Sequence, residues 1–501
     1  MINNTKKLGT NMISYSILMT LSSFEILIGL QIFQLNIIPM KYFLLIAITV
    51  IFVDILVASL FFLRSKKNQK LRRVLGYFFS VLIVLALFFA SRGVSKIQET
   101  MDAVTQTTQV SAVFELYVLK DAEAESLEDV ADDKIALTES IDLENTKIAL
   151  DALESSLGQV VQSVNYDNLF VMVDALYTKE AGALLINSAY VDILTELENY
   201  IDFQERVKCI WEYDIHQIIE EKIEDIPEEE AVVEEKSEDA PFAVYISGSD
   251  TRSKKLKTSR SDVNILAVVN PQTEQILLVN TPRDYYIPNP AGNGALDKLT
   301  HCGIYGIDCS VQALSDLYDE EILYYGQINF TGFETLIDAI GGVDVYSDVA
   351  FNLPEAGCSY KQGWNHLDGI QALNFARERH SLKGGDNARG QNQMKVIEAV
   401  VDQISAGNII TNYSEIMNSL QGMFSTNISS EKISSLVKLQ LSEMIHWDVK
   451  SYAVTGSGGS AKPYSMGMNA YVMYPNQETV DHAKMLIDKV MSGEVLTDED
   501  F

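Results

Sequence analysis

The chain has 501 residues, of which 47% are hydrophobic, and its formal net charge is −31 at pH 7. This length predicts roughly two to four units of about 100–200 residues each. Apolar residues dominate positions 1–92, whereas positions 98–240 contain 36 acidic and only 8 basic residues. Such an acidic segment repels nucleic acid and anionic lipid, which excludes DNA binding for the bulk of the protein.

Three apolar runs at the start of the chain, at 12–33, 42–63 and 74–90, predict transmembrane helices. Each approaches or exceeds the ~18–20 residues that cross ~30 Å of hydrocarbon as a helix. The loop Arg64–Arg73 has six cationic residues, whereas the hairpin between the first two runs has only Lys41. Because cationic loops stay on the cytoplasmic side, we expect a multi-pass protein of the cell membrane with a cytoplasmic N-terminus. Residues from about 92 onward would then be extracytoplasmic.

Residues 93–220 predict a small α/β accessory domain. Val110–Leu119 and Ala181–Asn187 have the apolar, β-branched composition of strands, while Thr146–Leu157 and Leu169–Leu176 fit helices. We find no obvious catalytic cluster in this domain. Residues 221–240 form a run of like charges with little apolar content, which predicts a solvated linker.

The remaining chain predicts a second α/β domain, with its core at 241–405 and its C-terminal part at 406–501. Phe242–Gly248, Val263–Asn270 and Gln275–Thr281 are continuous apolar runs, typical of strands buried on both faces. We therefore expect a three-layer α/β/α sandwich. Helices are predicted at 311–317, 331–340, 369–379, 390–405 and 479–491, and a Gly/Ser loop at Gly456–Ser460.

Charged residues lie just beyond the ends of these predicted strands. Asp250 follows the first strand, Arg260 and Asp262 precede the second, and Arg283 and Asp284 follow the third. Loops beyond strand ends are where α/β sheets usually build their sites. Asp250 and Asp262 could therefore converge on one Mg²⁺ ion, with phosphate oxygens supplying the other ligands.

A second group of arginines lies farther along the chain. Arg377 and Arg379 are two positions apart, so they share a target only if their helix ends there, which Gly384 and Gly385 favour. Arginine suits pyrophosphate because its planar fork donates two hydrogen bonds and stays charged. We find no G-x-S-x-G, H-E-x-x-H or P-loop motif. The arginines and paired carboxylates therefore predict electrostatic stabilisation in phosphoryl chemistry.

Seven segments resemble the LytR–CpsA–Psr domain in their order and spacing over about 160 residues. They are "GSDTR", "SRSDVNIL", "TPRDYYI", "DKLTHCGIYG", "NFTGFETLIDAIGGVDV", "LDGIQALNFARERHSL" and "DNARGQNQ". Three spans and an accessory domain ahead of such a domain resemble the capsule-associated branch of streptococci and relatives. The resemblance implies an α/β sandwich whose apolar interior accepts a polyprenyl chain.

The resemblance also implies roles for individual residues. Asp250 and Asp262 match the aspartates that hold Mg²⁺, and Lys298 matches a lysine that supports the site. The residues that match the phosphate head-group set are Arg260, Arg283, Arg377, Arg379, Arg389 and Gln393. Asp262, Arg283 and Asp284 are the candidates for catalysis, and either Asp262 or Asp284 would accept the proton of the acceptor.

The chain departs from the family pattern at two positions. Asn392 stands where many members carry an arginine, which removes one phosphate contact, and Cys302 replaces the usual alanine. None of the four cysteines forms a C-x-x-C pair. Free thiols and a Cys302–Cys309 disulfide both remain open from the sequence.

The expected function is a Mg²⁺-dependent transferase that moves a polyprenyl-pyrophosphate-linked polysaccharide, capsular in type, onto peptidoglycan. The alternative is a membrane regulator or scaffold that binds capsule polymerase, export or kinase proteins without essential catalysis. Direct transcription regulation is opposed by the topology, because only the N-terminus and the basic loop would face the cytoplasm. The polymer, the acceptor atom and the oligomeric state stay open.

Overall fold

The computed structural model of the chain describes residues 2–63, 68–105, 109–138, 141–218, 240–252, 256–379, 381–382, 385–405, 416 and 420–501. Residues 64–67 of the predicted basic loop and 221–239 of the predicted linker lie outside this set. The chain divides into two compact units, and each is described by itself. The first unit comprises residues 1–103, 413–418 and 429–445, and the second comprises the remainder.

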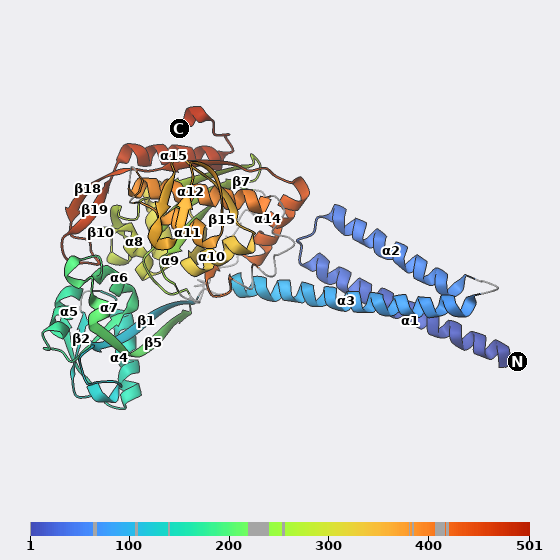
Figure 1. Cartoon of the computed structure of the whole chain (residues 1–501), viewed down its shortest axis with the longest axis horizontal. Helices are drawn as coiled ribbons and strands as arrows, with labels where there is room; N and C mark the ends of the chain where they lie inside the picture. The colour runs from blue at the N-terminus through green and yellow to red at the C-terminus, as the bar shows by residue number, and fades with distance from the viewer. Residues whose placement is uncertain are drawn as a thin grey trace, which may run out of the picture. The chain divides into compact units, whose positions relative to one another are not determined.

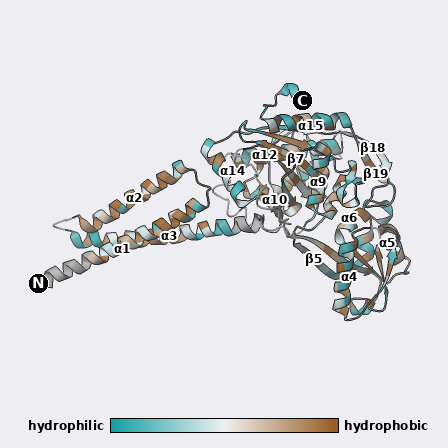
Figure 2. Ribbon diagram, turned by 180° about the vertical axis from the view of Figure 1, so that it is seen from behind, coloured by the Kyte–Doolittle hydropathy of each residue, from teal (hydrophilic) through white to brown (hydrophobic). Residues whose placement is uncertain are grey.

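The first unit consists mainly of three long apolar helices, coloured largely brown in Figure 2. They are α1 (Ile2–Gln34), α2 (Met40–Phe62) and α3 (Gln69–Thr105). Their segments Met12–Gln34, Met40–Phe62 and Gln69–Glu99 are long and apolar enough to cross a membrane. Few residues of these segments are buried, as expected of side chains that face lipid. The three predicted apolar helices are therefore confirmed, and the unit also includes α14 (Ser430–Glu443).

The second unit begins with a five-stranded sheet in the order β3-β2-β4-β1-β5. Figure 1 labels β1, β2 and β5 of this sheet. Its strands are β1 (Gln109–Leu119), β2 (Lys134–Thr138), β3 (Gln162–Tyr166), β4 (Ala183–Asn187) and β5 (Val207–Ile218). Its helices are α4 (Leu143–Leu157), α5 (Leu169–Tyr177), α6 (Val191–Leu194) and α7 (Phe203–Arg206). One apolar cluster joins the sheet to α4, and another joins it to α5 and α6. We call residues 109–218 the accessory domain.

The rest of the second unit is built on a six-stranded sheet in the order β16-β11-β6-β7-β8-β17. These strands are β6 (Phe242–Ser249), β7 (Val263–Asn270), β8 (Gln275–Asn280), β11 (Tyr324–Asn329), β16 (Phe424–Thr426) and β17 (Asp448–Ala453). β6 pairs antiparallel with β7 and parallel with β11, and β8 pairs parallel with β17. The continuous apolar runs thus occupy the centre of the sheet, as expected.

Helices cover both faces of this sheet and confirm the three-layer α/β/α architecture. On one face, Leu266 and Leu277 pack with residues of α9 (Ile307–Tyr318) and α15 (Gln477–Ser492). On the other face, Ile265 and Leu278 pack with Met394 of α12 (Asp386–Gln403). The remaining helices of four or more residues in the described range are α8 (Leu299–Cys302), α10 (Phe330–Ala339) and α11 (Gly369–Arg377). We call this part of the chain the sandwich domain.

Short strands pair outside the main sheet. They are β9 (Tyr286–Asn289), β10 (Ala295–Lys298), β12 (Val343–Ser347), β13 (Phe351–Leu353), β14 (Cys358–Tyr360), β15 (Gly363–Leu367), β18 (Gly456–Ala461) and β19 (Ala470–Pro475). The predicted Gly/Ser loop at Gly456–Ser460 is wrong, because these residues form β18, which pairs with β19. A Cβ on Gly459 would lie 2.5 Å from the ring of Tyr474. The glycine therefore makes room for a tyrosine ring against the strand, and it does not mark a turn.

All four cysteines are free thiols. Cys302 and Cys309 are both buried in the core of the sandwich domain. The disulfide that the sequence left open is therefore not formed.

Candidate active site

The sandwich domain contains a cavity of about 830 Å³, a size in the ~300–1,000 Å³ range of ligand pockets. Part of its wall is apolar and comes from β6, β7, β11, β13, α10, α11 and α12. These apolar residues are Ile246, Val263, Ile328, Phe330, Phe333, Leu353, Leu373, Val396 and Ile397. A cavity wall of this kind can enclose a hydrocarbon chain without leaving polar groups unpaired.

The polar part of the same wall contains most of the residues predicted from the sequence. They are Asp250, Asp262, Arg283, Arg377, Arg379, Arg389 and Gln393. The structure therefore brings together residues that span more than 140 positions of the chain. Arg260, Asp284 and Lys298 are absent from the cavity wall. Arg260 contacts Asp250 of the wall, and Asp284 lies between Arg283 of the wall and Lys298.

A buried hydrogen-bond network holds the loop that carries Asp262. The Tyr245 hydroxyl donates to Asn264 Oδ1 at 2.7 Å and lies 2.8 Å from Ser261 Oγ. The backbone N–H of Asp262 donates to a carbonyl of β6 at 2.8 Å. Gly303 lies so close that a Cβ there would be 2.8 Å from the Ser261 nitrogen. The loop is consequently fixed from both sides.

Two of the carboxylates that line the cavity, Asp250 and Asp262, have different surroundings. Arg283 Nη1 donates to Asp262 Oδ1 at 2.9 Å. Burial alone would raise the pKa of Asp262, but Arg283, Arg260 and Arg389 hold this pKa below its usual range. Burial and the negative charge of Asp262 raise the pKa of Asp250.

This pair of carboxylates fits a divalent cation, because a positive charge beside them would relieve the mutual repulsion of Asp250 and Asp262. Within the described residues, no group of three or more His, Cys, Asp or Glu side chains could hold a metal ion. Asp250 and Asp262 would supply two oxygen ligands to a cation held at this position. Magnesium is commonly held in this way, with phosphate and water completing its shell.

The arginines of the second group come from the end of one helix and the start of another. α11 ends at Arg377, and Glu378 after it is extended, with ψ 129°. The expected helix end is confirmed, and it lets both Arg377 and Arg379 line the cavity. Arg389 and Gln393 lie in the first turns of α12, whose N-terminal N–H groups also favour anions. Four guanidinium groups in all, including Arg283, thus meet at one cavity.

The positive charge of Arg377 is placed over an aromatic ring, with its guanidinium carbon 4.5 Å from the centroid of Phe330. Asn392, where many family members carry an arginine, donates its side-chain N–H to the carbonyl of Phe375 at 3.1 Å. This bond ties α12 to α11. Asn392 therefore stabilises the helix pair and is absent from the cavity wall.

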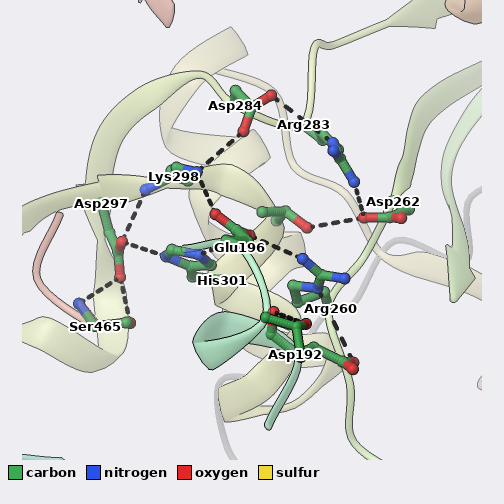
Figure 3. A network of polar contacts seen from close by, with 12 residues as sticks. Asp192, Glu196, Arg260, Asp262, Arg283, Asp284, Asp297, Lys298, His301 and Ser465 are labelled. Carbon is green, nitrogen blue, oxygen red and sulfur yellow. Dashed lines mark hydrogen bonds and ion pairs between the residues drawn. The ribbon is translucent and has the colours of Figure 1, made fainter. Parts of the chain in front are cut away.

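Behind the cavity, a carboxylate of the accessory domain joins the predicted cations (Figure 3). Glu196 accepts from Arg260 Nη1 at 2.8 Å and from Lys298 Nζ at 2.6 Å. Lys298 Nζ also lies 3.4 Å from Asp284, and Arg260 Nη2 lies 3.3 Å from Asp250. Burial would raise the pKa of Glu196, but His301 and Lys298 hold this pKa well below its usual range.

His301 extends this network deeper into the sandwich domain. Its Nδ1 lies 2.6 Å from Asp297 Oδ1, and its Nε2 lies 3.8 Å from Glu196 Oε1. Burial alone would lower the pKa of His301, but Asp297 and Glu196 raise it to about 9. Ser465 donates its backbone N–H to Asp297 at 3.1 Å. His301 is therefore a buried cation at neutral pH.

The contribution of the accessory domain could not be predicted from the sequence. Glu196 and Asp192, whose Oδ2 lies 4.0 Å from Arg260 Nε, are two acids among many in that part of the chain. Burial raises the pKa of Asp192 to about 6, against the attraction of Arg260. No local pattern distinguishes these two carboxylates, because their role depends on contacts with Arg260, which is 64 positions from Glu196 and 68 from Asp192.

Comparison with known proteins matches residues 213–486 to the model of the LytR_cpsA_psr family. A polyisoprenyl-teichoic acid–peptidoglycan teichoic acid transferase, TagU, of Enterococcus faecalis is 33% identical over 39% of this chain and 64% of its own length. TagU of Bacillus anthracis is 31% identical over 41% of this chain and 67% of its own length. This chain thus spans about two thirds of these relatives. A solved structure from Streptococcus agalactiae is 27% identical over 52% of this chain and 90% of its own, with a TM-score of 0.44.

Proposed function

Because the chain belongs to the LytR_cpsA_psr family, we propose that it is a membrane-anchored transferase that moves a polyprenyl-pyrophosphate-linked glycopolymer onto peptidoglycan. The names of its relatives, which describe the transfer of teichoic acid to peptidoglycan, support this reaction class. The polymer in this proposal is capsular polysaccharide. That choice rests on the three apolar helices and the accessory domain, which resemble the capsule-associated branch of the family.

The observation that carries the proposal is the dual character of the cavity wall. Its apolar residues match a polyprenyl chain, and Arg283, Arg377, Arg379 and Arg389 in the same wall match a diphosphate. The lipid and its charged head group would thus bind in one place. A cavity for a water-soluble sugar nucleotide would not require so long an apolar wall.

The arginines would bind the diphosphate and stabilise the negative charge that grows on it as the bond to the polymer breaks. A hydroxyl of the cell wall would attack the sugar-linked end of the donor, and polyprenyl (pyro)phosphate would leave. Asp250 and Asp262 would hold Mg²⁺, which, when bound, neutralises phosphate charge and polarises the reacting group. Gln393 would donate a neutral hydrogen bond to the head group.

The structure favours one of the two candidate bases. Asp262 lines the cavity, whereas Asp284 is absent from the cavity wall and lies 3.4 Å from Lys298 Nζ and 3.7 Å from Arg283 Nε. We therefore place Asp262 next to the reacting hydroxyl. Asp284, Lys298 and Arg260 would support the site from behind the wall.

The proposed location follows from the substrate and the helices together. Three apolar helices precede the accessory and sandwich domains. With the N-terminus in the cytoplasm, the cavity would lie outside, where a polyprenyl donor in the outer leaflet and the peptidoglycan acceptor are both available. The six cations of Arg64–Arg73 support this orientation.

The test compares two arginine substitutions in the full chain, expressed in a capsulated host that lacks its own copy. Arg379→Ala removes a charge from the cavity wall. We expect it to lower the wall-bound polysaccharide by about 30-fold or more, because loss of one donor to a transition-state anion costs roughly 2–4 kcal/mol. Arg252→Ala is the matched control, because Arg252 pairs with Glu334 at 3.0 Å and is absent from the cavity wall.

Both wall-bound polysaccharide and polymer released into the medium are measured. We expect Arg379→Ala to shift polymer from the wall to the medium, and Arg252→Ala to behave as the wild type. Unchanged attachment with Arg379→Ala and with Asp262→Asn would refute the transferase. That result would instead favour a membrane scaffold for capsule polymerase, export or kinase proteins.

A further inference from the structure

The accessory domain reaches into the polar network of the sandwich domain chiefly through Glu196, beside Asp192, which lies 4.0 Å from Arg260. Glu196 lies just beyond α6, and its two oxygens contact two different cations, Arg260 and Lys298 (Figure 3). All three side chains are largely buried, with exposed fractions of 18%, 10% and 5%. An ion pair with this burial has a defined geometry, unlike a surface pair whose members move in water.

The contact is supported by apolar packing around it. Tyr190 of the accessory domain is buried in the same cluster as Ile304 and Met466 of the sandwich domain. The rings of Tyr190 and Tyr305 meet edge to face, with centroids 6.5 Å apart at 75°. A buried seam of this kind holds the accessory domain in place, so Glu196 is presented to its partners by a fixed surface.

Glu196 contacts cations that in turn contact the acids of the proposed site. Arg260 reaches Asp250 at 3.3 Å, and Lys298 reaches Asp284 at 3.4 Å. Arg260 thus has carboxylates on two sides: Glu196 on one and the cavity-lining Asp250 on the other. If Glu196 lost its charge, Arg260 would be attracted only by Asp192 and by the carboxylates at the cavity.

We propose that Glu196 is a positioning residue that shares Arg260 with Asp250 and holds Lys298, so that Arg260 divides its charge and pairs only in part with the two carboxylates at the cavity. This inference rests on the proposed function, in which those two carboxylates hold a divalent cation. The accessory domain therefore belongs to the active site in a functional sense. Its carboxylate keeps the two cavity carboxylates available to the cation.

The test uses the full-length protein in lipid nanodiscs and titrates it with Mn²⁺ alone. Glu196→Gln removes the charge while it keeps the size of the side chain. We expect the Kd for Mn²⁺ to rise roughly tenfold, because Arg260, no longer shared with Glu196, pairs more fully with Asp250 and Asp262 and competes with the cation. Glu198→Gln is the matched control, since Glu198 is an exposed acid two positions farther along, and we expect its Kd to equal that of the wild type.

A second variant separates this mechanism from a general loss of structure. Glu196→Gln combined with Arg260→Gln removes both the Glu196 carboxylate and the Arg260 guanidinium. Neither charge of this buried pair is then left without the other. We expect the double variant to bind Mn²⁺ at least as tightly as the wild type. A merely structural role for Glu196 would give no such recovery. The double variant also decides the question if Glu196→Gln alone does not fold.

Two results would overturn this inference without affecting the proposed function. One is a folded Glu196→Gln chain with the wild-type Kd for Mn²⁺, and the other is a double variant that binds Mn²⁺ as weakly as the single variant. Steady-state kinetics provide an independent test. On an active chain we expect Glu196→Gln to lower kcat more than it raises KM for a lipid-linked donor, since Glu196 does not line the cavity. A wild-type chain that neither binds Mn²⁺ nor transfers polymer would remove the proposed function and the inference together.

Discussion

Lys298→Met tests whether the network behind the cavity stabilises the fold. The side chain of Lys298 is 5% exposed, with Glu196 at 2.6 Å and Asp284 at 3.4 Å. Removal of its charge takes away the Lys298 ammonium from both carboxylates in a buried place and leaves Glu196 with Arg260 at 2.8 Å and Asp284 with Arg283 at 3.7 Å. Breaking one partner of a buried pair typically costs about 3–5 kcal/mol. At about 2 °C per kcal/mol for a domain of ~250 residues, the melting temperature should fall by roughly 6–10 °C.

The assay is thermal unfolding of the full chain in detergent, followed by intrinsic fluorescence. Lys484→Met is the control, since Lys484 pairs with Asp319 at 2.5 Å but the two side chains are 26% and 77% exposed. Such a surface pair contributes about 0–1 kcal/mol, so the control should melt within ~2 °C of the wild type. Equal, small shifts for both variants would refute the claim that this network stabilises the domain. A Glu196→Gln/Lys298→Met double variant should lose less than the sum of the single losses.

Two further substitutions test the surroundings of the site. His301 has its pKa raised from 6.5 to about 9, so its stabilising contribution is complete below pH ~6.5 and disappears as the pH rises through about 9. This contribution is about 3 kcal/mol, and His301→Gln should flatten the melting temperature between pH 6 and 9.5; an unchanged pH profile would contradict the assignment. Gly303→Ala should destabilise the protein by about 2 kcal/mol or more, because its Cβ would lie 2.6 Å from the Ser259 carbonyl oxygen. In Gly326→Ala the nearest atom is 3.6 Å away, so denaturant unfolding should show a markedly smaller loss, and equal losses would count against the close packing of this loop.

The main elements could be predicted because their sequence patterns are strong and local. The three apolar strands at 242–281 are continuous β-branched runs, and only a sheet covered on both faces accommodates them. The end of α11 at Arg377 could be predicted from the glycines that follow it. The strand β18 could not, because the need for glycine arises from tyrosine rings on β19 that come later in the chain.

The candidate site was predictable only in part. The charged residues that line the cavity lie next to strand ends and helix ends, where sites are expected. Tertiary contacts decide which cations line the cavity, as Arg283 does, and which do not, as Arg260 and Lys298. Arg260 and Lys298 are turned toward Glu196, and the packing of one domain on another determines that direction. No pattern of charge or spacing in the sequence distinguishes an arginine that lines the cavity from one that does not.

The contact between Glu196 and its two cations has a practical consequence for work with shortened proteins. A fragment that starts at residue 241 would retain every side chain of the cavity wall. It would nevertheless expose the seam around Ile304 and leave Arg260, Lys298 and His301 without the carboxylate they share. Loss of transfer activity in such a fragment would reflect the missing accessory domain and not a defect of the cavity wall. Measurements of transfer should therefore use a chain that includes residues 109–218.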